Sequence, residues 1–79
     1  MDITTEVQNL CTNVKYLRRK NRLSKKEMAR RIGIGTGSLT KMERGELPPR
    51  VNCKIFLQIY FSFGITPAKM LKSHLWDEE

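Results

Sequence analysis

Cysteine and histidine are the residues of this chain best suited to nucleophilic or metal chemistry, and their spacing supports neither. Cys11 and Cys53 lie far apart, without CxxC spacing or a neighbouring histidine, and His74 is the single histidine. We expect two buried free thiols in a reducing compartment, with a disulfide as the minor alternative and no metal site. The sequence also lacks a nucleophile–histidine pair, a glycine-rich phosphate loop and paired carboxylates away from the termini. We therefore predict no enzyme and no cofactor.

Positive charge is the stronger chemical signal. Fifteen Lys and Arg residues stand against eight Asp and Glu, which gives a formal net charge of +7. Such an excess favours anionic partners, namely nucleic acid, an acidic protein surface or an anionic membrane. No apolar run approaches the roughly 20 residues that a membrane-spanning helix needs. The N-terminus also lacks the basic region and apolar core of a secretion signal, so we expect a cytoplasmic protein with no membrane partner.

The elements that could position this charge are most clearly marked between residues 24 and 45. Ser24 can cap a helix, and Glu27 three residues later completes a capping box. Gly33 can adopt the left-handed conformation that ends this helix. A second short helix is predicted from about Thr36 to Arg44. The residues of the pair predicted to face inward are Met28, Ala29, Ile32, Leu39 and Met42.

Three more helices complete an all-α prediction. The first runs from about Thr4 or Thr5 to Asn21, because its apolar residues recur at three- and four-residue steps. A fourth runs from about Val51 or Asn52 to Phe63, after a proline pair that cannot continue a helix. A fifth is capped by Thr66. We predict a compact five-helix bundle in which residues 1–79 form a single domain and residues 77–79 are frayed.

This arrangement resembles the phage-repressor and Cro-like (xenobiotic-response-element type) helix-turn-helix family of transcriptional regulators. The resemblance covers roughly Val14 to Leu71. Outside the two crossing helices it includes Leu17-Arg18, Glu43-Arg44-Gly45, Pro48-Pro49, Phe56-Leu57-Gln58-Ile59 and Phe63-Gly64-Ile65-Thr66. It implies a DNA-binding domain of the lambda-repressor type, with the helix-turn-helix motif formed by the second and third helices at about residues 24–45.

The resemblance also implies a structural ion pair. In the family, an arginine of the first helix pairs with the glutamate that ends the recognition helix, and Arg18 and Glu43 occupy those places. A bidentate pair would fix the angle between the two helices. The alternative is an unpaired, exposed Arg18 that adds to the basic surface.

In this family the second helix of the motif enters the major groove of double-stranded DNA. The resemblance then implies that bases are read by Thr36, Gly37, Thr40 and Lys41. Lysine can meet guanine O6 and N7, and threonine methyl groups suit thymine. Phosphates would be contacted by Lys25, Ser38, Arg44 and Arg50.

Two of these positions depart from the family pattern. Lys25 stands where glutamine is common, so it would make a contact through charge alone. Gly37 stands where the family often has a long polar side chain. Gly37 either lets the helix start approach DNA closely or contributes no base recognition, and we favour the second interpretation.

A single small module reads few base pairs, so members of this family usually bind as dimers with recognition helices roughly 34 Å apart. The C-terminal half supplies more apolar area than a small core needs, in Tyr60, Phe61 and Trp76 with Phe63 and Leu75. This area is either a dimer or partner surface or a core built from bulkier residues. We predict a repressor or Cro-like regulator that acts as a homodimer on a near-palindromic operator. The alternatives are an antitoxin or protein-interaction module with a partner docked on the C-terminal helices, and a protein that coats nucleic acid through charge.

Overall fold

The computed structural model describes residues 3–46, 53–72 and 74–75. In these residues the helices are α1 (Ile3–Lys20), α2 (Lys25–Ile32), α3 (Thr36–Glu43), α4 (Cys53–Phe63) and α5 (Pro67–Lys72). No strand occurs in the described part of the chain. The predicted all-α fold is therefore confirmed, and the described boundaries of α1 and α3 differ from the prediction by a residue or two. The predicted start of the fourth helix at Val51 or Asn52 lies outside the described residues. The predictions made for Arg50, Trp76 and the frayed end at 77–79 lie outside the described residues.

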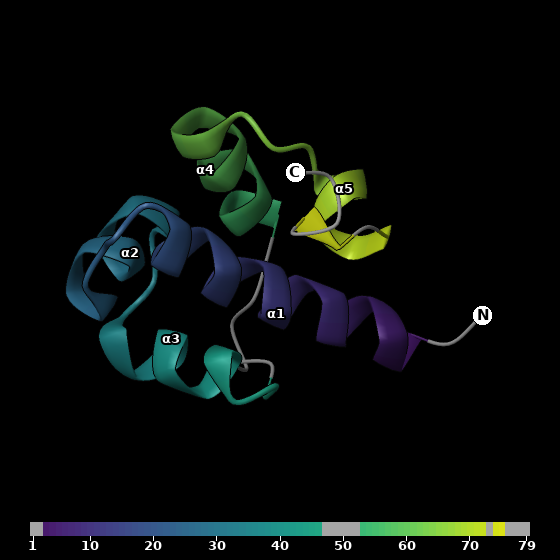
Figure 1. The fold of residues 1–79 in the computed structure, drawn as a ribbon, viewed down its shortest axis with the longest axis horizontal. Helices are drawn as coiled ribbons and strands as arrows, with labels where there is room; N and C mark the ends of the chain where they lie inside the picture. Colours follow the sequence, from purple (N-terminus) through teal and green to yellow (C-terminus); the bar gives the residue numbers. More distant parts are fainter. Residues whose placement is uncertain (1–2, 47–52, 73, 76–79) are drawn as a thin grey trace.

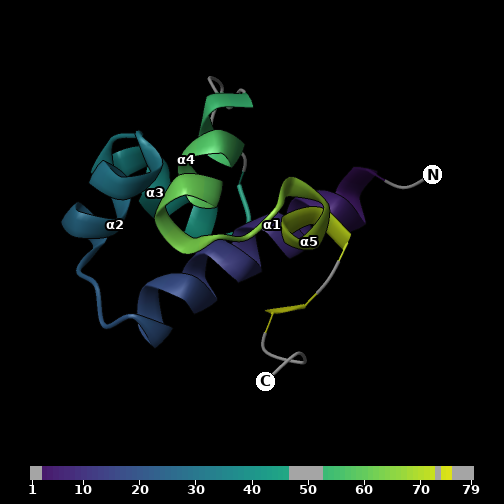
Figure 2. The ribbon, with the colours of Figure 1, turned by 90° about the horizontal axis from the view of Figure 1, so that it is seen from above.

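The helices surround α1, which crosses the middle of the molecule (Figure 1). α3 and α4 lie on opposite sides of α1, and seen from above α4 overlies α3 (Figure 2). α2 packs against both α3 and α4, while α5 packs against α1. The third and fourth helices are thus held apart by the core, and their outer faces point in opposite directions.

One hydrophobic core joins the five helices. α1 contributes Leu10, Val14 and Leu17 at helical spacing, and Leu23 follows it into the interior. Ala29 is buried on α2, the helix that packs against both α3 and α4, where a small side chain allows close approach. The other buried apolar residues are Cys11, Met28, Ile32, Leu39, Met42, Ile55, Ile59, Met70 and Leu75.

Two asparagines on α1 bind the C-terminal end of α5. Asn13 is fully buried, and its Nδ2 donates to the Met70 carbonyl at 2.9 Å while its Oδ1 accepts from the Leu75 backbone N–H at 3.1 Å. Asn9, one turn earlier, donates from Nδ2 to the Leu71 carbonyl at 2.8 Å. The last carbonyls of a helix have no partner within it. The asparagine side chains supply that partner and tie α5 to α1.

The structure divides the C-terminal apolar residues between the two alternatives, a core and a surface. Leu75 is only 4% exposed and belongs to the core. Phe63 is half-buried and packs against the core. The Leu75 position follows from its hydrogen bond to Asn13, which the spacing of apolar residues does not reveal. Tyr60 and Phe61 remain exposed.

The two cysteines have different surroundings. Both are free, but Cys11 is buried and Cys53 is exposed, so the prediction of two buried thiols is wrong for Cys53. Cys53 is two residues before the buried Ile55, and two residues of helix turn a side chain to the opposite side. Burial raises the pKa of the Cys11 thiol, which keeps it in the less reactive protonated form.

We expect a thiol-specific reagent to modify one cysteine in the native protein and both after unfolding in urea. The reason is that Cys53 is exposed at the first residue of α4, whereas Cys11 lies in the core. Mass spectrometry of the digested, alkylated protein identifies the modified residue. Rapid modification of Cys11 under native conditions would show that the contact between α1 and the core opens readily.

Candidate nucleic-acid interface

α2 begins at a well-formed N-cap. Ser24 has an extended backbone, and its Oγ accepts from the Glu27 backbone N–H at 3.1 Å. The same hydroxyl donates to Glu27 Oε1 at 3.1 Å. The carboxylate also lies in the first turn, where the helix dipole favours negative charge. These contacts satisfy one of the free N–H groups of the helix start and set where α2 begins.

The turn between α2 and α3 depends on a left-handed residue. Gly33 has φ 77°, and the Ile34 backbone N–H donates back to the Ala29 carbonyl at 3.0 Å, as in a Schellman motif. A Cβ atom at Gly33 would meet Gln58 Cγ at 3.6 Å, an ordinary contact distance. The backbone conformation, rather than lack of space, is therefore the reason for glycine here.

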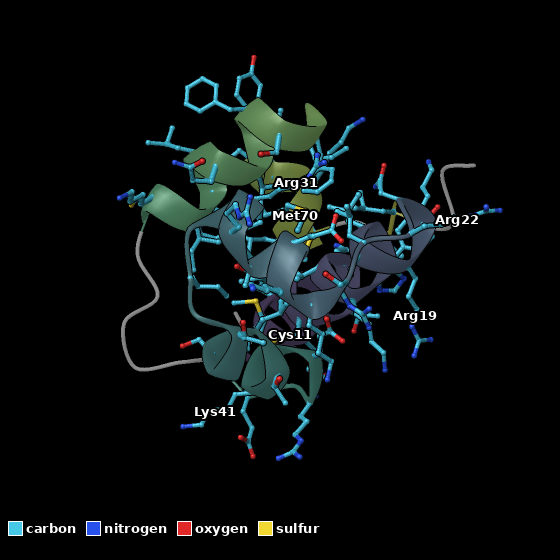
Figure 3. All side chains as sticks on the ribbon, turned by 90° about the vertical axis from the view of Figure 1, so that its left-hand side faces the viewer. Cys11, Arg19, Arg22, Arg31, Lys41 and Met70 are labelled. Atoms are coloured by element: carbon cyan, nitrogen blue, oxygen red, sulfur yellow. The ribbon has the colours of Figure 1, made fainter. Side chains whose placement is uncertain are left out.

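α3 presents its polar side to solvent. Leu39 and Met42 are fully buried, which orients the helix with its opposite side outward. That outer side carries the four residues predicted to read bases, Thr36, Gly37, Thr40 and Lys41. All of them are exposed except Thr40, which is half-buried. Figure 3 shows Lys41 at the outer edge of the molecule, directed away from the other helices.

The structure shows the local surroundings of two of these α3 residues, Thr40 and Gly37. Thr40 Oγ1 donates to the Thr36 carbonyl at 3.0 Å, so its hydroxyl hydrogen is used within the helix. A Cβ atom at Gly37 would meet nothing within 4 Å. Packing within the chain therefore does not require glycine at position 37.

The end of α3 is bound to α1 by an ion pair. Arg18 Nε lies 2.6 Å from Glu43 Oε2, and Arg18 Nη2 donates to Glu43 Oε1 at 3.1 Å. The side chains are 17% and 6% exposed, respectively. Arg18 Nη1 also donates to the Leu23 carbonyl at 3.3 Å. One guanidinium thus connects α1, the segment before α2 and the last turn of α3.

The residues predicted to contact phosphates are placed as follows. Lys25 is the first residue of α2 and is exposed, Arg44 is exposed just after α3, and Ser38 is half-buried. Arg50 lies outside the described residues. Lys15 of α1, which we did not predict as a contact, lines a shallow groove together with Arg44. Helical spacing placed Lys15 on the polar side of α1, but only the packing of α3 on α1 brings it near Arg44.

A family model described as helix-turn-helix matches residues 14–52 of this chain. The chain belongs to the Cro/C1-type helix-turn-helix family. This match confirms the resemblance to phage-repressor and Cro-like regulators. Neither the curated proteins nor the solved structures include a significant match to the chain.

Membership of the helix-turn-helix family makes this chain a DNA-binding transcription regulator. The family is a regulatory rather than an enzymatic one. Within the described residues, no group of three or more His, Cys, Asp or Glu residues is arranged to hold a metal ion. No helix in the same residues is both long and apolar enough to cross a membrane. α2, the Gly33 turn and α3 form the helix-turn-helix itself.

Proposed function

We propose that this helix-turn-helix protein is a sequence-specific regulator of the repressor or Cro type that binds double-stranded DNA as a homodimer. The proposal rests on α3, whose apolar side is fully buried while its polar side faces solvent. A helix that is anchored on one side and exposed on the other can enter the major groove without rearrangement. The positive charge of the chain favours the approach to a polyanion.

In the proposed complex, Lys41 is the main base-reading residue. Its flexible ammonium group can donate to guanine O6 and N7, while the methyl groups of Thr36 and Thr40 contact thymine. Gly37 makes no base contact, and the fold leaves the space beside it empty. Lys25, Ser38, Arg44 and Arg50 contact phosphates and orient α3 in the groove.

Selection of bound sequences from a random duplex pool at two salt concentrations tests this function. A dimeric regulator selects two related half-sites whose centres are separated by about one DNA turn, roughly 34 Å. Each neutralised phosphate adds about 0.9 to the slope of log affinity against log salt concentration. A pool that stays random, with a steep salt dependence, would instead identify a protein that coats nucleic acid through charge.

Replacing Lys41 with alanine is expected to weaken binding to the selected operator by about 1–3 kcal/mol and to relax the preference at one base pair. The reason is loss of the hydrogen bonds to one guanine, so binding to unrelated duplexes should change much less. Titrations of operator and unrelated duplexes measure both effects.

Lys69→Ala is the matched control for this experiment. It removes the same charge from an exposed residue of α5, away from α3. We expect it to leave the selectivity unchanged. An equal loss of affinity for all duplexes in the Lys41→Ala variant would make Lys41 a phosphate ligand and contradict the proposed role.

A further inference from the structure

The outer side of α4 carries the largest exposed apolar side chains of the described residues. Leu57, Tyr60 and Phe61 are 54%, 49% and 76% exposed. Ile55 and Ile59 anchor the opposite side of the helix in the core. Residues three and four apart lie together on a helix, so the three exposed side chains form one continuous surface. We call Leu57, Tyr60 and Phe61 the α4 face.

Positive charge borders the α4 face at both ends. Lys54 precedes Leu57 by three residues on the same side of the helix. At the other end of the helix, Ser62 Oγ donates to the Arg31 carbonyl at 3.3 Å, which places the end of α2 against the end of α4. Arg31 lies next to α4 in Figure 3. Neither α4 nor α5 contains an acidic residue, and Lys54 and Arg31 are both exposed.

We infer that the α4 face docks an acidic amphipathic helix of a second protein. Such a helix presents apolar residues at three- and four-residue spacing to Leu57, Tyr60 and Phe61. Its flanking carboxylates meet Lys54 and Arg31. Complementary charge of this kind selects the partner and speeds the encounter, while the aromatic side chains supply most of the affinity.

A second copy of this chain fits the α4 face less well. Self-association would bring the two sets of Lys54 and Arg31 together, and like charges across an interface are unfavourable. In addition, α4 lies on the opposite side of α1 from α3 (Figure 1). Two copies joined through α4 would point their α3 helices in opposite directions, away from a shared duplex. The argument from the direction of the α3 helices rests on the proposed function, whereas the argument from like charges does not.

The docking is tested with a synthetic 18-residue helical peptide that has leucines at helical spacing and glutamates on both flanks. A matched peptide has lysines in place of the glutamates, and neither contains cysteine. We expect the full chain to bind the glutamate peptide at least about tenfold more tightly than the lysine peptide. Bound peptide should also slow alkylation of Cys53, because that exposed residue lies on the same side of α4.

Variants then separate the α4 face from the remaining basic surface. Phe61→Ser is expected to weaken binding of the glutamate peptide by about tenfold or more, because the central aromatic residue of an interface supplies much of its affinity. Lys54→Glu should reduce the difference in affinity between the glutamate peptide and the lysine peptide. Both replaced side chains are exposed, and equal urea unfolding curves verify that the variants fold. Leu57→Ser provides a second variant of the same face.

Two outcomes would overturn the inference. Peptide binding that is unaffected by Phe61→Ser would place the peptide elsewhere on the basic surface. A dimer that sedimentation detects in the parent chain and not in Phe61→Ser would make a second copy the occupant. Lys41→Ala keeps the two proposals separate, because this variant should relax the operator preference at one base pair and still bind the glutamate peptide normally.

Discussion

Replacing Glu43 with alanine is expected to lower the free energy of unfolding by about 3 kcal/mol, at the lower end of the range for breaking a buried ion pair. The Arg18 guanidinium would keep its bond to the Leu23 carbonyl but lose both carboxylate contacts. The lower end of the range applies because Arg18 is 17% exposed and water can reach part of it. In a chain of this size, such a loss should lower the melting temperature by at least about 12 °C.

Glu43→Ala should also abolish operator binding under conditions in which the variant protein is still folded. Arg18 and Glu43 connect α1 to the last turn of α3, so the angle of the recognition helix depends on them. Glu46→Ala is the matched control, since that glutamate is exposed beyond α3. Urea unfolding and operator titration of both variants provide the measurements.

The double variant Arg18→Met/Glu43→Leu gives a further test of the ion pair. Replacement of both charges by apolar groups of similar size leaves no buried charge alone, so it should recover much of the lost stability. Operator binding should recover less, because two apolar side chains cannot reproduce the bidentate geometry. If Glu43→Ala costs less than about 1 kcal/mol, the pair behaves like an ordinary surface ion pair and does not hold α3.

Replacing Asn13 with alanine is expected to cost about 2–6 kcal/mol of unfolding free energy, since two buried polar groups lose their partner and each such group costs about 1–3 kcal/mol. The substitution removes the donor to the Met70 carbonyl and the acceptor of the Leu75 N–H together. Urea unfolding measures the loss, and hydrogen exchange of the Leu75 amide should accelerate more than that of amides in α3.

Two controls identify the cause of the Asn13 effect. Asn9→Ala removes a similar contact to Leu71 from a half-buried position, so it should cost less. Asn13→Asp keeps an acceptor for Leu75 but removes the donor to Met70. Operator affinity of the folded Asn13→Ala protein should stay close to that of the parent, because α5 packs mainly on α1. A large change in operator affinity would show that α5 influences the recognition helix.

The α4 face has a consequence for how such a regulator could be controlled. A partner bound at Leu57, Tyr60 and Phe61 would leave α3 uncovered, since the two helices lie on opposite sides of α1. DNA and the partner could therefore bind at the same time. A protein bound to its operator would then carry an acidic partner on its outer side.

The helices and the turn of the motif were predictable because they depend on neighbouring residues. Ser24 caps α2 through the N–H of Glu27, and Gly33 ends it by adopting a positive φ. The spacing of apolar residues in α1 correctly predicted which side of this helix faces the core. Where the residue type was ambiguous, prediction failed: cysteine is usually buried, yet Cys53 falls on the outer side of α4. Leu57 is exposed on that same side and was not predicted as part of a surface.

The sequence by itself determined the five helices, the helix-turn-helix and the polar side of α3, since each follows from interactions within a few residues. Only the tertiary structure decided that Asn13 binds Met70 and Leu75, and that Lys15 and Arg44 line one groove. It also decided that the α4 face points away from α3. These contacts join helices that are distant in the chain. Their geometry depends on how all five helices pack around one core, which no local pattern of residue types can encode.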